Sequence, residues 1–120
     1  MSQTPGVVSL HPYFKAHPGK IDAVRAMLPA FVEKSTGEAK SLYYEFTSSG
    51  DLFFCREGYI GAEGVLTHLG NVGELLGQLL QITDLHRFEV HGPAAELEKL
   101  KDALGPHNPQ WFVVECGVKR

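Results

Sequence analysis

The sequence predicts an α+β protein built around an antiparallel sheet, and three observations indicate this class. Two aromatic-rich runs, residues 41–47 and 52–59, have the composition of strands and flank a Ser-Ser-Gly-Asp turn. Apolar residues at helical spacing follow the first and the third strand-like runs. The chain has 120 residues, of which 43% are hydrophobic and 21% charged, so it can form one domain with its own core.

The first half of the chain predicts strand, helix, strand and strand. Residues 7–16 alternate as a strand, and Pro12, which lacks an N–H group, indicates an edge position or a bulge. Residues 20–34 form an amphipathic helix with Pro29 inside it, where a kink is expected. The hairpin of residues 41–59 follows, and its return strand places Phe53, Cys55, Glu57 and Tyr59 on one face.

The second half predicts another helix and strand, then an extension. A helix from Gly61 to about Leu69 is expected to break at Gly70-Asn71 and to resume over residues 72–81. Five glycines between Gly61 and Gly77 weaken its intrinsic helicity, each by roughly 1 kcal/mol relative to alanine.

The fourth strand is predicted at residues 85–91, with His86, Phe88 and Val90 on one face. A C-terminal extension at about residues 93–116 adds a helix and a short strand at residues 111–116. The first six elements read β α β β α β, the order of the split βαβ, or ferredoxin-like, fold with both helices on one face of the sheet.

Composition excludes several classes of function. The net charge of −3 gives no reason to expect a nucleic acid or an anionic membrane surface as partner. The N-terminal residues lack the features of a signal peptide, and no apolar run approaches the ~20 residues that span a bilayer. Two cysteines are too few for a disulfide framework, so a cytoplasmic location is expected. A disulfide between Cys55 and Cys116 stays an open alternative.

The order of these motifs resembles the antibiotic-biosynthesis-monooxygenase-like family. The resemblance covers about residues 7–90. It rests on a first strand that runs into Pro18-Gly19, on Glu38, Leu42 and Tyr44 after the helix, on a strand ending in Glu57 and Tyr59, and on His68 in the next helix. Ala39 and Lys40 depart from the family's usual Pro-Gly.

The resemblance implies a dimeric α+β barrel in which the sheets of two copies pack face to face, and it implies a pocket between sheet and helices in each copy. A single layer of helices leaves one sheet face uncovered, which also favours a homodimer, with residues 111–116 as a possible interface strand. Enzymes of the family resemble cofactor-independent oxygenases that act on quinol-like aromatics, and others degrade haem.

His68 is the candidate catalytic base, because an imidazole titrates near neutral pH and the family places this helix position toward the pocket. The alternative is a structural histidine bonded to a backbone carbonyl. The candidate substrate-binding residues are Tyr44, Tyr59, His11, Tyr13 and His86. Tyrosines at such positions also fill cores with one hydroxyl satisfied at the edge.

Other chemistries have less support. The six histidines show no metal-ligand spacing, so no metal is expected. The sequence has no phosphate-binding glycine loop, so no nucleotide cofactor is expected either. Glu57 is expected to hold structure rather than act as a base, and Cys55 to be a small buried hydrophobe.

The resemblance therefore implies a cofactor-independent monooxygenase that oxidises a small aromatic or quinol-like substrate with O₂. The alternative is a non-catalytic dimeric module of the same fold that binds a small molecule or serves in stress responses.

Overall fold

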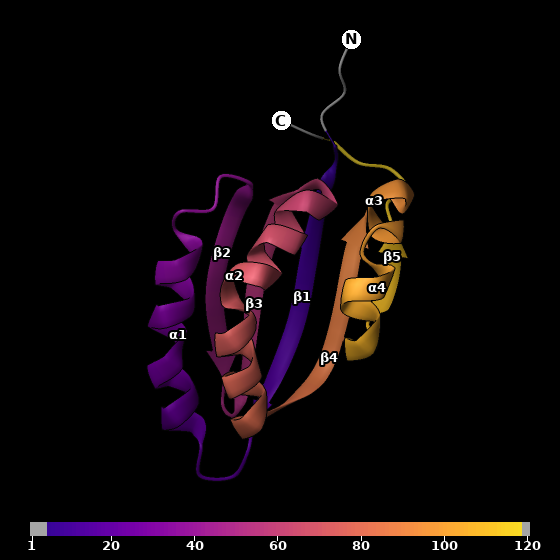
Figure 1. Ribbon diagram of the computed structural model, residues 1–120. Coiled ribbons are helices and arrows are strands. Elements are labelled where there is room, and N and C mark those ends of the chain that lie inside the picture. The colour runs from indigo at the N-terminus through magenta and orange to yellow at the C-terminus, as the bar shows by residue number, and fades with distance from the viewer. Residues whose placement is uncertain (1–4, 119–120) are drawn as a thin grey trace.

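The predicted hairpin forms one edge of a five-stranded sheet (Figure 1). The structure is a computed structural model that describes residues 5–118; residues 1–4, which include part of the N-terminal segment considered above, lie outside the described residues. The strand order is β2-β3-β1-β4-β5. The strands are β1 (Val7–Ala16), β2 (Ser41–Ser49), β3 (Leu52–Ile60), β4 (Thr83–Gly92) and β5 (Gln110–Val113).

The helices lie against one side of this sheet. Figure 1 shows α2 in front of β3 and β1, α1 beside β2, and the C-terminal helices in front of β4 and β5. The helices are α1 (Ile21–Ser35), α2 (Gly61–Ile82), α3 (Ala94–Glu98), α4 (Lys101–Leu104) and a 3₁₀ turn, η1 (Gly105–His107). The α+β class and the ferredoxin-like order of the first six elements are confirmed.

The four strands of the split βαβ arrangement form the predicted antiparallel sheet, and a fifth strand makes the sheet mixed. Strands β1 to β4 pair antiparallel, but β5 runs parallel to β4, with Val90 opposite Trp111. The segment between them, α3 to η1, is a crossover connection of the kind that parallel strands require. Residues of the predicted interface strand therefore pair within their own chain, at the edge of the sheet.

Strand β1 is central, so Pro12 does not mark an edge strand. The other option, an irregularity, is what the structure shows: the register between β1 and β4 shifts between Tyr13 and Phe14. Opposite this shift, Arg87 pairs with Tyr13 and Leu85 with Phe14. His86 falls at the extra position and is exposed, so it does not share the inner face with Phe88 as predicted.

The helix α2 is continuous through Gly70-Asn71, where a break was predicted. Its buried residues recur at helical spacing and pack on the sheet, and this tertiary packing outweighs the low helix propensity of its glycines. No helix in the described part of the chain is long and apolar enough to cross a membrane.

The buried core has two clusters. One joins Val8 and Leu10 of β1 to the first turns of α2 and to α3 and α4. The other joins Phe14 of β1 to α1 and the last turns of α2. Side chains from both clusters line a cavity beneath α2, so the fold positions a pocket between the sheet and its helices.

Candidate active site

The cavity lies between the inner face of the sheet and the helices α1, α2 and α4. Most of its lining is apolar, including Phe14, Phe31, Leu79 and Phe88. The polar exceptions are Tyr44, Cys55, Glu57, His68 and His107. Its free volume is about 60 Å³, so a ligand with an aromatic ring requires lining side chains to move. Half-buried leucines of α2, among them Leu76 and Leu80, are in a position to do so.

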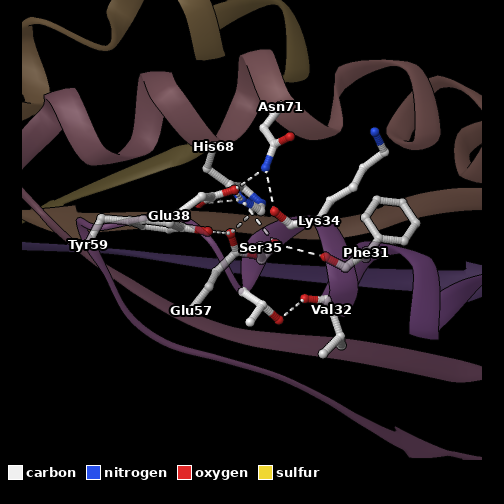
Figure 2. A network of polar contacts seen from close by, with 10 residues as sticks. Phe31, Val32, Lys34, Ser35, Glu38, Glu57, Tyr59, His68 and Asn71 are labelled. Atoms are coloured by element: carbon white, nitrogen blue, oxygen red, sulfur yellow. Dashed lines mark hydrogen bonds and ion pairs between the residues drawn. The ribbon is translucent and has the colours of Figure 1, made fainter.

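His68 projects from α2 into this cavity and is 3% exposed. Its Nδ1 atom lies 2.9 Å and 3.1 Å from the two carboxylate oxygens of Glu38, in the connection between α1 and β2 (Figure 2). Burial lowers the pKa of His68, and the hydrogen bond and negative charge of Glu38 oppose that change. At neutral pH the imidazole is therefore neutral and able to accept a proton.

Glu57 brings a carboxyl group to the same place from β3. It is buried, its Oε1 accepts a hydrogen bond of 2.7 Å from the hydroxyl of Tyr59, and the same oxygen lies 3.7 Å from Nε2 of His68. Desolvation raises the pKa of Glu57 to about 7, although hydrogen bonds from Tyr59 and Cys55 act in the opposite direction. A carboxyl that is about half protonated at neutral pH and a neutral imidazole thus face each other at the wall of the cavity.

Tyr44 and Tyr59 pack against the imidazole. Their ring centroids lie 4.9 Å and 5.2 Å from that of His68. Burial raises the pKa of both phenols, with a further contribution from the charge of Glu57, so both hydroxyls remain protonated. Tyr44 lines the cavity directly. Tyr59 lies behind Glu57 and is linked to the cavity wall by its hydrogen bond to that carboxyl group.

Cys55 completes the polar wall and is 1% exposed. Burial and the adjacent Glu57 raise the pKa of its thiol, which stays protonated and is a poor nucleophile. Cys55 and Cys116 are both free, so the disulfide that the sequence left open is not formed in the structure.

Two of the six predicted site residues, His68 and Tyr44, line the cavity, and a third, Tyr59, contacts His68 and Glu57 behind its wall. The other three lie elsewhere. His11 and Tyr13 lie on the opposite face of the sheet, where Tyr13 stacks on Phe54 with centroids 4.6 Å apart and His11 lies near His91. His86 is exposed on β4. None of the three is among the residues that line the cavity.

The sequence reasoning gave no role to Glu38 and assigned Glu57 to structure. Glu38 was part of the motif that carried the family resemblance, but its partner His68 lies 30 residues away, and only the packing of α1 on α2 brings them together. Glu57 carried a stronger signal: a carboxylate on the buried face of an apolar strand is rare without a partner. His107 reaches the cavity from the C-terminal extension.

The polar side chains of the site are of types suited to proton transfer. Among residues 5–118, no group of three or more His, Cys, Asp or Glu side chains is arranged to hold a metal ion. His68, Glu57 and Tyr44 bring groups that can accept a proton, donate a proton and donate a hydrogen bond to a mostly apolar space.

The fold, with its cavity between sheet and helices, defines a class of protein, as does the order of the motifs. Comparison with known proteins identifies this class. The chain is similar to MupZ from Pseudomonas fluorescens, with 35% sequence identity and a TM-score of 0.89; the match covers 100% of this chain and 93% of MupZ. A protein of Chloroflexus aurantiacus, provisionally named an antibiotic biosynthesis monooxygenase, is 20% identical over 73% of this chain and 93% of its own, with a TM-score of 0.60.

A further solved structure, named an antibiotic biosynthesis monooxygenase, has 17% identity and a TM-score of 0.61, and the match covers 69% of this chain and 92% of that protein. No family model and no curated protein sequence matches the chain. The chain belongs to the same family as MupZ. Its ferredoxin-like fold is that of the antibiotic-biosynthesis-monooxygenase-like proteins.

Proposed function

We propose that this protein is a cofactor-independent monooxygenase that oxidises a small aromatic or quinol-like substrate with O₂ in the cavity beneath α2. The observation that carries the proposal is the pairing of His68 with Glu57, both buried, at the wall of an otherwise apolar cavity. An electron-rich ring fits the apolar lining, and the polar wall supplies the proton transfers that its oxidation needs.

In the proposed reaction, Nε2 of His68 takes the phenolic proton of the substrate. The resulting anion is oxidised by O₂, and a bond forms between a ring carbon and oxygen to give a peroxide. The O–O bond then breaks as the ring carbon loses its hydrogen as a proton. The departing oxygen takes the proton held by His68 and one from Glu57 and leaves as water, the proton from carbon restores Glu57, and a quinone carbonyl remains. Glu57, with its proton, is placed to protonate the departing oxygen, and Tyr44 to donate a hydrogen bond to the substrate oxygen.

The proposal includes a homodimer and a cytoplasmic location. The sheet face opposite the helices carries exposed or half-buried rings, including Tyr13, Phe54 and Phe112, and a second copy would cover them.

A second candidate function follows from Glu57 itself. A carboxyl with a pKa of about 7, which lies 3.7 Å from Nε2 of a neutral imidazole, is also suited to a proton-transfer reaction that needs no O₂, such as the isomerisation of an enol-type substrate. The non-catalytic binding module remains the third possibility.

One experiment separates these functions. The purified protein is incubated with a panel of quinols, naphthols and anthrones, with and without O₂, while O₂ uptake is followed and products are identified by mass spectrometry. A monooxygenase consumes one O₂ per product and places one atom of ¹⁸O from ¹⁸O₂ in the quinone. Conversion that is equal without O₂ supports the second candidate, and binding without conversion supports the third.

A further inference from the structure

Behind His68, on the side away from Glu57, lies a second buried carboxylate whose role the proposed reaction does not explain. The side chain of Glu38 is only 6% exposed, and both of its oxygens are within hydrogen-bonding distance of Nδ1 of His68. Burying a carboxylate costs free energy unless it is well paired. A carboxylate buried against the ring of a candidate catalytic base is therefore a feature to be explained.

Glu38 is itself held from α2. The amide of Asn71 donates one hydrogen bond of 2.8 Å to Oε2 of Glu38 and another of 2.7 Å to the backbone carbonyl of Lys34 at the end of α1. Asn71 follows His68 by three residues and so lies on the same side of the helix. One amide thus ties the end of α1 to α2 and fixes the carboxylate against the imidazole (Figure 2).

This arrangement determines where the imidazole carries its proton. A carboxylate oxygen accepts hydrogen bonds, so the nitrogen that faces it, Nδ1, is the one that bears hydrogen in the neutral ring. The lone pair is then on Nε2, the nitrogen that lies 3.7 Å from Glu57. The orientation is the one needed for a base directed at the cavity, and the opposite tautomer would present an N–H group there instead.

We propose that Glu38 and Asn71 are positioning residues that hold His68 in the Nδ1–H tautomer, with Nε2 directed toward Glu57 and the substrate. This inference rests on the proposed function of His68 as the base and deepens it. A carboxylate that is hydrogen-bonded to Nδ1–H of a catalytic histidine orients the ring and stabilises the imidazolium. Glu38 has this role when His68 accepts a proton.

Among residues 5–118, no other group around the imidazole is placed for this role. The titratable side chains around it come from each element that packs against this part of α2: Glu38 from the connection after α1, Tyr44 from β2, Cys55, Glu57 and Tyr59 from β3, and His107 from η1, which lines the same cavity. Ser35 lies 3.5 Å from Nδ1, but its hydroxyl donates to the carbonyl of Phe31 at 2.8 Å.

The test is a pH titration of the His68 ring nitrogens by long-range ¹H–¹⁵N correlation in protein labelled with ¹⁵N-histidine. The wild-type protein is expected to show the Nδ1–H tautomer. Glu38→Gln keeps an oxygen for the N–H group but removes the charge, so the His68 pKa falls further. Glu38→Ala and Asn71→Ala remove the acceptor or its support, and both tautomers become populated. Glu63→Gln removes an equal charge from an exposed residue at the start of α2 and is expected to leave the His68 signals unchanged.

A merely structural Glu38 would change stability without changing these signals. An Nε2–H tautomer in the wild-type protein, or an unchanged His68 pKa in Glu38→Gln, would overturn the proposal. Because the readout needs no substrate, it holds whether or not O₂ uptake is found. Where turnover is found, Glu38→Gln is expected to lower kcat on the order of tenfold or more with little change in KM, since the lost interaction strengthens only as His68 is protonated.

Discussion

Glu57 is the residue at which burial and chemistry are most closely coupled. In the unfolded chain its carboxyl ionises near the ordinary pKa of 4.5, whereas in the folded protein desolvation holds the proton until about pH 7. Between these two values folding takes up a proton. The stability that Glu57 contributes is therefore complete below about pH 4.5 and is lost as the pH rises to 7.

Replacing this carboxyl by an amide removes the effect. We expect Glu57→Gln, which keeps an oxygen for the Tyr59 hydroxyl, to gain about 3 kcal/mol relative to wild type between pH 4.5 and pH 7, the equivalent of the pKa difference. Urea unfolding followed by circular dichroism at several pH values measures it. His68, whose pKa is lowered, contributes in the opposite direction. Parallel pH profiles for the two proteins would show that Glu57 is ionised in the folded state.

The sequence predicts the direction of a side chain well where neighbouring residues determine it, and poorly where distant parts of the chain do. The inward face of β3, with Phe53, Cys55 and Tyr59, follows from the period of a strand and is confirmed by burial. The pairing of Glu38 with His68 depends on how α1 packs against α2, which no local pattern specifies. The outward turn of His86 depends on a register shift between two strands that are distant in the sequence.

At the scale of elements, α2 shows how tertiary packing can override propensity. Three of its glycines, Gly70, Gly73 and Gly77, face open space, where a Cβ atom would meet nothing within 4 Å. Gly64 differs, since its Cβ would lie 3.0 Å from the Cβ of Tyr59 and 3.2 Å from the backbone oxygen of Lys40. The close approach of α2 to β3, and so the position of His68 over Glu57, therefore depends on the glycine at position 64.

These glycines give a matched pair of substitutions. Gly73→Ala is expected to raise the free energy of unfolding by about 1 kcal/mol, because alanine loses less backbone entropy in a helix. Gly64→Ala is expected to lower it despite the same gain in propensity, because the added methyl group meets Tyr59 and Lys40. Denaturant unfolding of both variants measures the difference. Equal stabilisation by both would contradict the close packing of α2 on β3.

The predicted breaks and ends of elements were less accurate than the elements themselves. The break expected at Gly70-Asn71 is absent because the apolar stripe of α2 continues through Val72 to Leu79. The last strand was predicted from its composition, but its parallel pairing with β4 was not, since strand direction depends on the path of the connection. The hairpin of β2 and β3 was predicted correctly because its turn and alternation are contiguous.

At the scale of the whole molecule, the sheet has one covered face and one open face. Rings run across the open face: Tyr13 stacks on Phe54 with centroids 4.6 Å apart, and His91 stacks on Phe112 at 4.4 Å. If two copies pack through this face, a charge at its centre should separate them, because a carboxylate there would be buried without a partner.

The oligomeric state tests this arrangement. We expect the wild-type protein to elute as a dimer in size-exclusion chromatography with light scattering, and Phe54→Asp to elute as a folded monomer. Leu66→Asp places the same charge on α2, where the leucine is 42% exposed, and should leave the dimer intact. A monomeric wild type, or equal dissociation by both variants, would place the open face outside any interface.

The central claim is that His68 is the base of a reaction in the cavity, and the rate of O₂ uptake tests it most directly. With the best quinol of the panel, His68→Gln should lower kcat by about 100-fold or more, the range in which a general base contributes. His86→Gln removes an exposed imidazole from the same protein and should leave kcat unchanged. Equal rates for the wild-type protein and His68→Gln, or no O₂ uptake with any member of the panel, would contradict the account.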